Sequence, residues 1–253
     1  MHRTELENTL STLLVPASFQ DYCPNGLQIE GSKTISKIAF SVSATRASIT
    51  EAIAAGADTL IVHHGLFWHF HGARTLTGSF GKRIMPLVQH NINLLAYHLP
   101  LDAHPKVGNA AVLGQLINCH QQRPFGDYKG SPTGIEGLLT QPTSAKDLSL
   151  LLTSVLNHPV ILASPDANQL IESVGIITGG ANSDWALAKQ AGLDAYITGE
   201  ISEHDWHESQ ENGIHMFAGG HHATEKFGIQ ALMQHIQAQY PLECFFIDSS
   251  NPA

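Results

Sequence analysis

The stretch ISKIAFSVSATRASITEAIAAGADTLIVHHG, residues 35–65, decides the fold class. Its first part, 35–43, alternates like a strand, 46–55 has the apolar spacing of a helix, and 59–62 is a short, fully apolar run typical of a buried strand. A strand–helix–strand unit places its two strands parallel in one sheet. The stretch therefore predicts an α/β protein with an at least partly parallel sheet.

Further elements of both kinds follow along the chain. We expect helices over 4–14, 81–90, 109–118, 144–156, 182–190 and 222–238, and strands over 92–97, 137–139, 159–163, 170–177, 195–198, 214–218 and 243–247. The segment 121–134 is rich in Pro and Gly and interrupts this pattern. We therefore expect a first α/β lobe over 1–120, a connection over 121–134 and a second α/β lobe over 135–253.

The two predicted lobes share a pattern. In the first, Ala55-Gly56-Ala57-Asp58 leads to a strand that ends in His63-His64, and in the second, Ala191-Gly192-Leu193-Asp194 leads to a strand that ends in Gly199-Glu200. Each lobe then continues to a strand that is followed by a histidine and an acid, namely His98 with Asp102 and His221 with Glu225. The pattern predicts a weak internal duplication, with chance convergence of two strand–helix–strand units as the alternative.

Composition excludes several classes of protein. The chain carries 22 acidic against 13 basic residues, a formal charge of −9, without a Lys/Arg cluster that would track phosphates, so charge does not support nucleic-acid binding. Three widely spaced cysteines without CxxC spacing predict reduced thiols. The sequence shows neither a run of 18 apolar residues nor a signal-peptide pattern, so we expect a soluble, cytoplasmic protein without a membrane partner.

Histidine is the compositional anomaly, with 16 copies. Two of them, His63 and His64, directly follow an apolar strand, at the carboxyl end where parallel α/β sheets carry their sites. Adjacent strand residues point to opposite faces, so both imidazoles serve one site only if the chain turns there, which Gly65 permits. The alternative is one core histidine and one exposed histidine.

A second motif opens a predicted helix. His221 and Glu225 follow Gly219-Gly220 and are four residues apart, so they share one face of that helix. An imidazole and a carboxylate at the mouth of a strand-to-helix turn are suitable metal ligands. The alternative is a helix N-terminus that favours an acidic residue in its first turn.

A third motif, His98 to Asp102, also follows an apolar strand, and Pro100 favours an extended turn that holds Asp102 near the sheet edge. Three strand ends that each deliver His or acid groups point to a divalent cation, because buried charges need partners. The candidate ligands are His63, His64, Asp102, His221 and Glu225. Three imidazoles and two carboxylates exceed one tetrahedral zinc site and suit two cations that share a bridging carboxylate and a bridging water.

Other histidines have weaker assignments. For His69 and His71 we expect a loop face or a subunit contact, with a place behind the metal ligands as the alternative. Glu200, together with His204 and His207 in an acidic helix, is a candidate for acid/base groups lining the pocket. The sequence lacks GxxxxGK[ST], GxGxxG after a strand and GxSxG, so nucleotide-loop and serine-hydrolase classes have no motif support.

With these residues identified, the chain resembles the NGG-one-interacting-factor-three-like family, also called GTP cyclohydrolase 1 type 2 homologues or dinuclear metal centre proteins. The resemblance runs nearly end to end and its motifs are specific. The stretches that carry it are Asp21-Tyr22-Cys23-Pro24-Asn25-Gly26-Leu27-Gln28, Val62 to Trp68, Tyr97 to Asp102, Gly108-Asn109, Ile197 to Glu200 and Gly220 to Glu225. One departure is His222, where the family more often has Tyr or Phe.

The resemblance implies more than the residues do alone. The family's metal ligands fall on the same five residues reached above, and they hold two divalent cations per subunit, of which iron, manganese, zinc and nickel are all candidates. It further implies two similar α/β lobes with mixed, partly parallel sheets, a metal site between them that faces an internal cavity, and a homo-hexamer built as a trimer of dimers. The segment 121–134 is too short for the domain inserted in longer members.

These expectations lead to a hypothesis of function. We expect a metal-dependent hydrolase that acts on an unidentified small molecule through a metal-bridging hydroxide, with Glu225 as the bridging carboxylate and Glu200, His204 or His98 handling protons. The family's GTP cyclohydrolase label is compatible with such a site, because opening a purine ring is hydrolytic. The alternative is a non-enzymatic metal-binding or scaffold hexamer.

Overall fold

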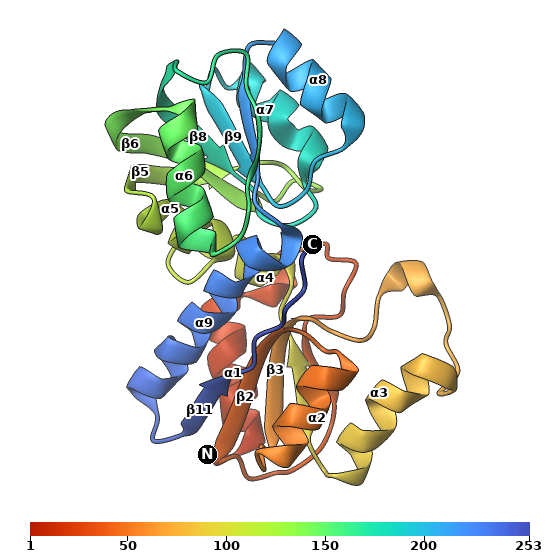
Figure 1. Cartoon of the computed structure of the whole chain (residues 1–253). Helices are drawn as coiled ribbons and strands as arrows, with labels where there is room; N and C mark the ends of the chain where they lie inside the picture. The colour runs from red at the N-terminus through yellow and green to blue at the C-terminus, as the bar shows by residue number, and fades with distance from the viewer. The chain divides into compact units, whose positions relative to one another are not determined.

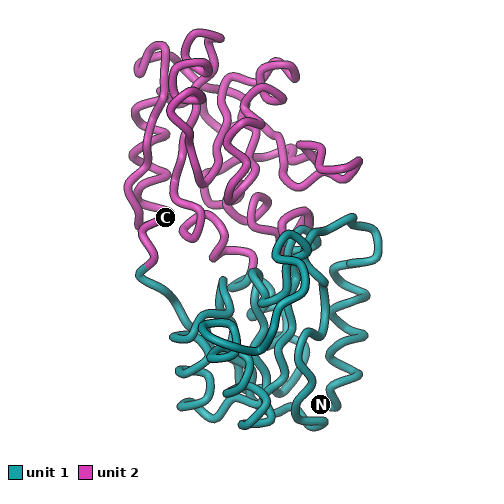
Figure 2. The backbone as a smooth tube through the Cα atoms, turned by 90° about the vertical axis from the view of Figure 1, so that its right-hand side faces the viewer, with its two compact units in different colours: residues 1–101, 229–250 teal, residues 102–228, 251–253 magenta.

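The computed structural model describes residues 1–253 and divides into two compact units (Figure 2). Unit 1 comprises 1–101 and 229–250, and unit 2 comprises 102–228 and 251–253. The chain therefore passes between the units three times, within the helices α4 (Leu99–Asp102) and α9 (His221–Gln239) and again after Ser250. None of the helices is both long and apolar enough to span a membrane.

This division differs from the predicted boundary at 121–134. Most of β5 (Cys119–Phe125) lies in that segment, and β5 pairs antiparallel with β6 (Gly134–Ser144), so the segment belongs to the sheet of unit 2. Gly126 and Gly130 have φ of +84° and +85° in the turn that joins the two strands. Gly and Pro mark a break in periodicity, but they do not show whether the break separates two domains or only two strands of one sheet.

Unit 1 contains a five-stranded sheet in the order β1-β4-β3-β2-β11. Strands β2, β3, β4 and β11 run parallel, and β1 pairs antiparallel with β4 at one edge. The strands are β1 (Gly26–Ile29), β2 (Lys37–Ser43), β3 (Thr59–His64), β4 (Asn93–Ala96) and β11 (Glu243–Phe246), and the helices are α1 (Arg3–Leu14), α2 (Arg46–Ala54) and α3 (Gly78–Gln89) (Figure 1).

Both faces of this sheet are buried, as parallel sheets require. Alternate strand residues such as Ala39, Leu60 and Leu94 pack with the apolar faces of α2 and α3 in one core cluster. Their neighbours on the opposite face, for example Phe40 and Ile61, are also fully buried. The strand predicted over 59–62 is apolar throughout because both faces of β3 are buried.

Unit 2 contains a six-stranded sheet in the order β5-β6-β8-β9-β10-β7, with β8, β9 and β10 parallel. The remaining strands are β7 (Ile161–Ala163), β8 (Leu170–Ile176), β9 (Ala195–Thr198) and β10 (His215–Ala218), and the helices are α5 (Asn109–Leu116), α6 (Ala145–Leu156), α7 (Trp185–Gln190) and α8 (Glu203–Glu211). Helices α5 and α6 pack with Ile197 and Phe217, whereas α7 packs with Tyr196 and Met216, so helices cover both faces of this sheet as well.

The two units repeat one arrangement, which supports the predicted duplication. β2-β3-β4 and β8-β9-β10 are both parallel triplets, and β1 and β7 are both antiparallel edge strands on the third member. The register pairs Thr59 with Asn93 and Ala195 with His215, so the helices that begin at Leu99 and His221 each start six residues after an equivalent position. The sequence pattern paired His98 with His221. By strand register, the residue of unit 1 that corresponds to His221 is Leu99.

The repeated aspartates explain the shared Ala-Gly-x-Asp pattern. Oδ2 of Asp58 accepts hydrogen bonds from the amide nitrogens of Ser36 and Lys37, at 2.7 and 3.0 Å, and from the Ser36 hydroxyl at 2.9 Å. Oδ2 of Asp194 likewise accepts from the amides of Glu172 and Ser173, at 3.0 and 2.9 Å, and from the Ser173 hydroxyl at 2.9 Å. Asp58 ties the residue before β3 to the start of β2, and Asp194 ties the residue before β9 to the third and fourth residues of β8.

We expect Asp58→Asn and Asp194→Asn to destabilise the protein by about 1.5–3 kcal/mol each, because each replaces a charged acceptor of three hydrogen bonds. Urea unfolding gives the free energy, and hydrogen exchange shows which unit opens. Glu208→Gln, at an exposed carboxylate on α8, is the control. An unfolding free energy for both aspartate variants equal to that of Glu208→Gln would show that these carboxylates do not set the strand starts.

Candidate functional site

His63 and His64 end β3, and their rings lie close together. His63 is fully buried with Nδ1 3.0 Å from the carbonyl oxygen of Tyr97, and half-buried His64 has Nδ1 3.0 Å from Oγ of Ser43. Their ring centroids are 4.6 Å apart. The strand stops at His64, and Gly65 follows it outside the strand; His63 is a core residue, whereas His64 is half-buried rather than exposed.

The anchoring of His63 selects a tautomer. A carbonyl oxygen only accepts, so Nδ1 of His63 carries the proton and donates it to Tyr97. In the neutral ring Nε2 then has the lone pair, which is the form that coordinates a cation. Gly65 makes the turn possible, because a Cβ at this position would overlap the side-chain amide of Gln28, whose Oε1 accepts from the Leu66 amide at 2.8 Å.

His98 is a third imidazole in the same cluster. Its Nδ1 donates to Oδ1 of Asp21 at 2.9 Å, and candidate ligand atoms of His63, His64 and His98 all lie within 4.8 Å of one another. Burial by itself would raise the pKa of Asp21, but hydrogen bonds from His98, Asn25 and the Cys23 amide lower it below the ordinary value. Asp21 therefore holds the His98 ring as a charged acceptor.

Sequence reasoning missed Asp21 as a functional residue. Its side chain is 2% exposed and also accepts from the Leu99 amide at 3.0 Å, so it ties the segment after α1 to the start of α4. The only sequence signal was its place in the first stretch of the family resemblance. Nothing in the spacing indicated that residue 21 would meet residue 98, because they lie 77 positions apart.

Unit 2 supplies an imidazole and two carboxylates. His221 and Glu225 lie one turn apart at the start of α9, with Nε2 of His221 3.1 Å from Oε2 of Glu225. Oε1 of Glu200, in the loop after β9, is 2.6 Å from Nδ1 of His221. Burial by itself would lower the pKa of His221, but the hydrogen bonds and charges of Glu225 and Glu200 raise the pKa to about 9.

Asp102 begins unit 2 and is buried close to Glu225. It accepts from Nδ2 of Asn109 at 2.8 Å and from the Thr178 hydroxyl at 3.4 Å. One oxygen each of Asp102 and Glu225 lie within 4.8 Å, and the two residues are only 7% and 3% exposed. Two buried carboxylates at this separation oppose each other's ionisation, so positive charge beside them favours their ionised forms. The His221 ring, with its raised pKa, is one source of that charge, and a bound cation would be another.

The turn before Asp102 differs from the one predicted. Pro100 lies in the single helical turn α4 rather than in an extended segment, because proline is tolerated in the first turn of a helix, where its missing N–H has no partner to lose. The helical turn places the Asp102 carboxylate within hydrogen-bond distance of Nδ2 of Asn109. Oδ1 of Asn109 accepts from the backbone N–H of Gly228 at 2.7 Å.

Gly179 shapes the carboxylate side of this group. Its φ is +70°, its amide donates to the Thr224 hydroxyl at 3.1 Å, and a Cβ built on it would overlap Oε1 of Glu225. Only glycine therefore leaves room for the Glu225 carboxylate in its present orientation. The sequence analysis did not single out this residue, although the Gly179-Gly180 pair after β8 was a visible signal.

The remaining candidates lie in different surroundings. His204 is on the exposed side of α8, with Nε2 3.6 Å from Oδ1 of Asp205, and His207 pairs with Glu203 at 3.3 Å. His222 is buried and its amide donates to the Ala253 carbonyl at 2.9 Å. His69 and His71 are exposed in the 3-10 turn His69–His71, so the predicted loop face is correct for both.

Asp205 positions the loop that carries Glu200. The residue is 1% exposed, and its side chain accepts from Nε1 of Trp185 at 3.0 Å, from Nδ2 of Asn182 at 2.7 Å and from the Ser202 amide at 3.3 Å. Burial by itself would raise the pKa of Asp205, but these hydrogen bonds lower it below the ordinary value. Glu200 therefore lies in a short loop between β9 and the start of α8, which Asp205 fixes by hydrogen bonds.

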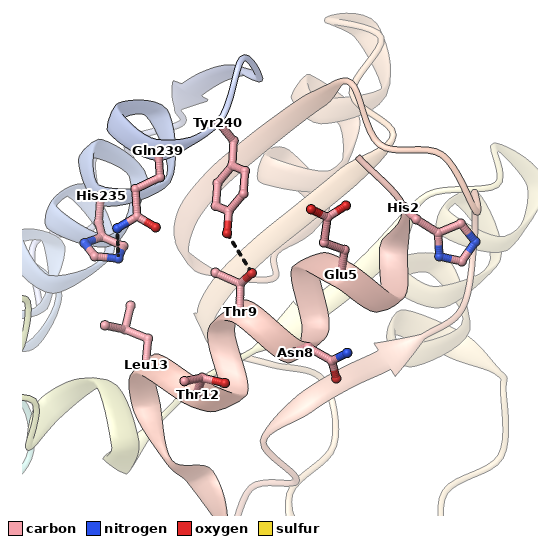
Figure 3. A pocket seen from close by; sticks show the side chains of 9 residues that line it. All are labelled: His2, Glu5, Asn8, Thr9, Thr12, Leu13, His235, Gln239 and Tyr240. Atoms are coloured by element: carbon pink, nitrogen blue, oxygen red, sulfur yellow. Dashed lines mark hydrogen bonds between the residues drawn. The ribbon is translucent and has the colours of Figure 1, made fainter.

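A groove of about 830 Å³ in unit 1 is a different feature. It runs between α1 and α9 and is lined by polar side chains of both helices (Figure 3). The Thr9 and Tyr240 hydroxyls share a hydrogen bond of 3.0 Å, and Nε2 of Gln239 is 2.9 Å from Nε2 of His235. Four of the lining side chains pair with one another, and the groove includes no predicted site residue, so we place the candidate site at the strand ends instead.

Fold and side chains together define a class of protein. Two α/β units of related topology carry His, Asp and Glu groups that could hold a metal ion at the carboxyl ends of their parallel strands, the usual place for sites in such sheets. The chain belongs to the Duf34/NIF3 (NGG1p interacting factor 3) family, whose model matches residues 1–252.

Individual relatives agree with this assignment. A protein of Pasteurella multocida (strain Pm70) described as a GTP cyclohydrolase 1 type 2 homolog is 42% identical over 253 residues, which cover 100% of both chains. The solved structure of protein ybgI, described as of unknown function, has a TM-score of 0.92 at 38% identity and full coverage of both chains. The protein TTHA1606 from Thermus thermophilus has a TM-score of 0.90 at 32% identity, again with full coverage.

The lowered pKa of Asp205 predicts a pH dependence of stability. A carboxylate with a depressed folded-state pKa stabilises the fold above its unfolded pKa of about 4, and this contribution is lost as pH falls through the folded pKa. We expect Asp205→Asn to lose about 1–3 kcal/mol at pH 7 and the gap to wild type to close below about pH 4. Urea unfolding between pH 3 and 7 measures this gap. A gap that stays constant down to pH 3 contradicts the assignment.

We expect Gly179→Ala to weaken binding of Mn²⁺ or Zn²⁺ by about tenfold or more, because the new Cβ displaces the Glu225 carboxylate. Gly192→Ala is a matched control, since Gly192 has φ +74° and open space around its Cβ position, so it carries the same backbone strain without touching a carboxylate. Calorimetric titration of metal measures both variants. Equal affinities for the two would refute the role of Gly179.

Proposed function

We propose that this protein binds two divalent cations and uses them to hydrolyse a small molecule. The proposed ligands are His63, His64, Asp102, His221 and Glu225. The observation that carries the proposal is the pair of buried carboxylates in unit 2, Asp102 and Glu225, whose oxygens lie within 4.8 Å beside the His221 ring. An imidazole beside two buried carboxylates is a donor set that iron, manganese, zinc and nickel accept.

The ligand rings are held in the manner of metal sites. His63 is anchored by a carbonyl, His64 by a hydroxyl and His221 by the Glu200 carboxylate, each through Nδ1. Partners of this kind fix the ring orientation and raise the basicity of the coordinating nitrogen. Three imidazoles and two carboxylates exceed the needs of one tetrahedral ion, which supports two ions with Glu225 as the bridging carboxylate.

When bound, paired divalent cations lower the pKa of a water and polarise the bond to be cleaved. The chain's own groups would then handle protons. His98 is held by Asp21 next to His63 and His64, which suits it to accept or return a proton. Glu200 orients His221 through the 2.6 Å bond and has a half-exposed carboxylate, and His204 on α8 is the third candidate.

Resemblance extends the proposal to substrate and assembly. The relatives are named GTP cyclohydrolase 1 type 2 homologs, and opening of a purine ring is a hydrolysis compatible with this donor set. We further propose a cytoplasmic homo-hexamer built as a trimer of dimers. The exposed apolar residues Met85 and Val88, three positions apart on α3 and 43% and 54% exposed, are surface that a subunit contact would bury.

The test is a screen of the protein loaded with iron, manganese, zinc or nickel against nucleotides, phosphoesters and amides. We expect turnover by wild type that falls by about 100-fold or more in Glu225→Ala, with metal content reduced in parallel. Glu211→Ala, at the exposed end of α8, is the control and should act like wild type. Light scattering checks that each variant keeps its assembly.

Two outcomes would contradict parts of this proposal. Metal bound by wild type without turnover under any of the four loadings would remove the hydrolase and leave the non-enzymatic metal-binding scaffold. Equal metal content in wild type and Glu225→Ala would remove the assigned ligand set itself.

A further inference from the structure

A buried histidine at the start of β10 has one ring nitrogen without a hydrogen-bond partner. His215 is fully buried, and its Nδ1 lies 2.8 Å from Oγ of Ser164, the residue that follows β7. Its Nε2 is also buried and makes no hydrogen bond. Buried polar atoms are nearly always paired, because an unpaired one has lost its contact with water without a replacement. This histidine therefore needs an explanation beyond packing.

Unit 1 has an asparagine at the corresponding position. By strand register, Asn93 at the start of β4 corresponds to His215 at the start of β10. Oδ1 of Asn93 accepts from the Gly31 amide at 2.8 Å, and its Nδ2 donates to the Ser32 carbonyl at 2.9 Å. Gly31 and Ser32 come after the antiparallel edge strand β1, as Ser164 comes after β7. Both side chains thus hold the segment after an edge strand, but only the one in unit 2 can take up a proton.

The surroundings keep the His215 ring neutral in the folded protein. Burial lowers the pKa of His215 below its ordinary value, although the carboxylates of Asp194, before β9, and Asp166, in the loop after β7, act in the opposite direction. Helix α6 also meets this loop, where the Lys146 amide donates to the Ala167 carbonyl at 2.9 Å, but the Lys146 side chain is exposed. The ring is therefore uncharged at pH 7.

The neutral and charged rings differ in the hydrogen bonds they require. A neutral imidazole has one donor and one acceptor nitrogen, and either can pair with the Ser164 hydroxyl. The charged ring donates from both nitrogens, and Nε2 of His215 has no acceptor inside unit 2. A buried charge with an unpaired donor is unfavourable, so protonation favours a structure in which this ring reaches water.

Strand β7 is the element whose opening would give the ring access to water. It consists of only three residues, Ile161–Ala163, lies at the edge of the sheet and pairs with β10 alone. Ile161 at its start is 53% exposed. A short edge strand is held by few backbone hydrogen bonds and opens at lower cost than an interior strand, whereas β10 is also paired with β9.

We propose that the contact between Ser164 and His215 is an acid-sensitive switch: the neutral ring holds the end of β7 on β10, and the charged ring releases it. The open form exposes the ring, whose pKa then returns to about 6.5, so the open form binds the proton more tightly than the closed form. Acid below about pH 6.5 therefore favours opening. Unit 1 lacks this response, because Asn93 makes the corresponding contact without a titratable group. The inference is independent of the proposed metal ions and of hydrolysis.

Hydrogen exchange of the full-length protein at pH 7.5 and pH 5.0, each corrected for the intrinsic exchange rate, tests this switch. We expect the protection of the backbone amides in β7 and in the segment 164–169 to fall by about tenfold at pH 5.0, whereas β1 keeps its protection. His215→Asn places the residue of unit 1 at this position and should make the protection of β7 nearly equal at the two pH values. His120→Asn, at an exposed histidine on the other edge strand of this sheet, β5, is the matched control and should behave like wild type.

A second variant tests the charge directly. Asp166→Asn removes a carboxylate that favours the charged ring inside unit 2, so the loss of β7 protection at pH 5.0 should be larger than in wild type. The new amide can still accept the bond that Oδ1 of Asp166 accepts from the Asn168 amide at 2.9 Å, so the loop should keep its shape.

Four results would overturn the inference. These are unchanged β7 protection in wild type at pH 5.0, an equal loss in wild type and His215→Asn, a smaller loss in Asp166→Asn than in wild type, and a loss spread evenly over all strands of unit 2, which would show general acid unfolding. If His215→Asn opens β7 at both pH values, the comparison of Asp166→Asn with wild type decides the matter.

Discussion

In each unit one aspartate carboxylate sets where the central parallel strand begins. Asp58 and Asp194 accept hydrogen bonds from two successive amides of the neighbouring strand, so the register of each parallel triplet is fixed at its amino end. Side chains alternate along a strand, and a shift by one residue would send every one of them to the other face. The residues that emerge at the carboxyl edge, His63 and His64 in unit 1 and Glu200 in unit 2, therefore depend on a contact at the opposite end of the strand.

At that carboxyl edge the strongest constraint is electrostatic. Asp102 and Glu225 are buried close together, Asn109 and Thr178 donate to Asp102, and the His221 ring lies 3.1 Å from Glu225. The pKa of His221 is raised to about 9 because Glu225 and Glu200 favour the charged ring, against the effect of burial. The proton on this ring is therefore part of the electrostatic balance at the start of α9.

Local patterns predicted most helices and strands because both faces of each parallel sheet are buried and the strands are correspondingly apolar. They missed β1 and β5, which lie at sheet edges and have Gly26 and Pro124 in them, so neither shows the alternation or apolar run of an interior strand. The compact units also have other boundaries than the expected lobes. Two helices, α4 and α9, begin in one unit and end in the other. Helical periodicity does not reveal this, because the spacing of apolar residues is the same when a helix packs in one unit or in both.

The sequence by itself determined the α/β class, the internal repeat and the candidate ligands, because a parallel sheet delivers the ends of its strands to one edge and histidine and acid residues stand at those ends. Only the tertiary structure showed that Asp21 holds His98 and that Gly179 makes room for Glu225. These relations join residues that lie dozens of positions apart. They depend on how loops return to a strand end, which no local spacing encodes.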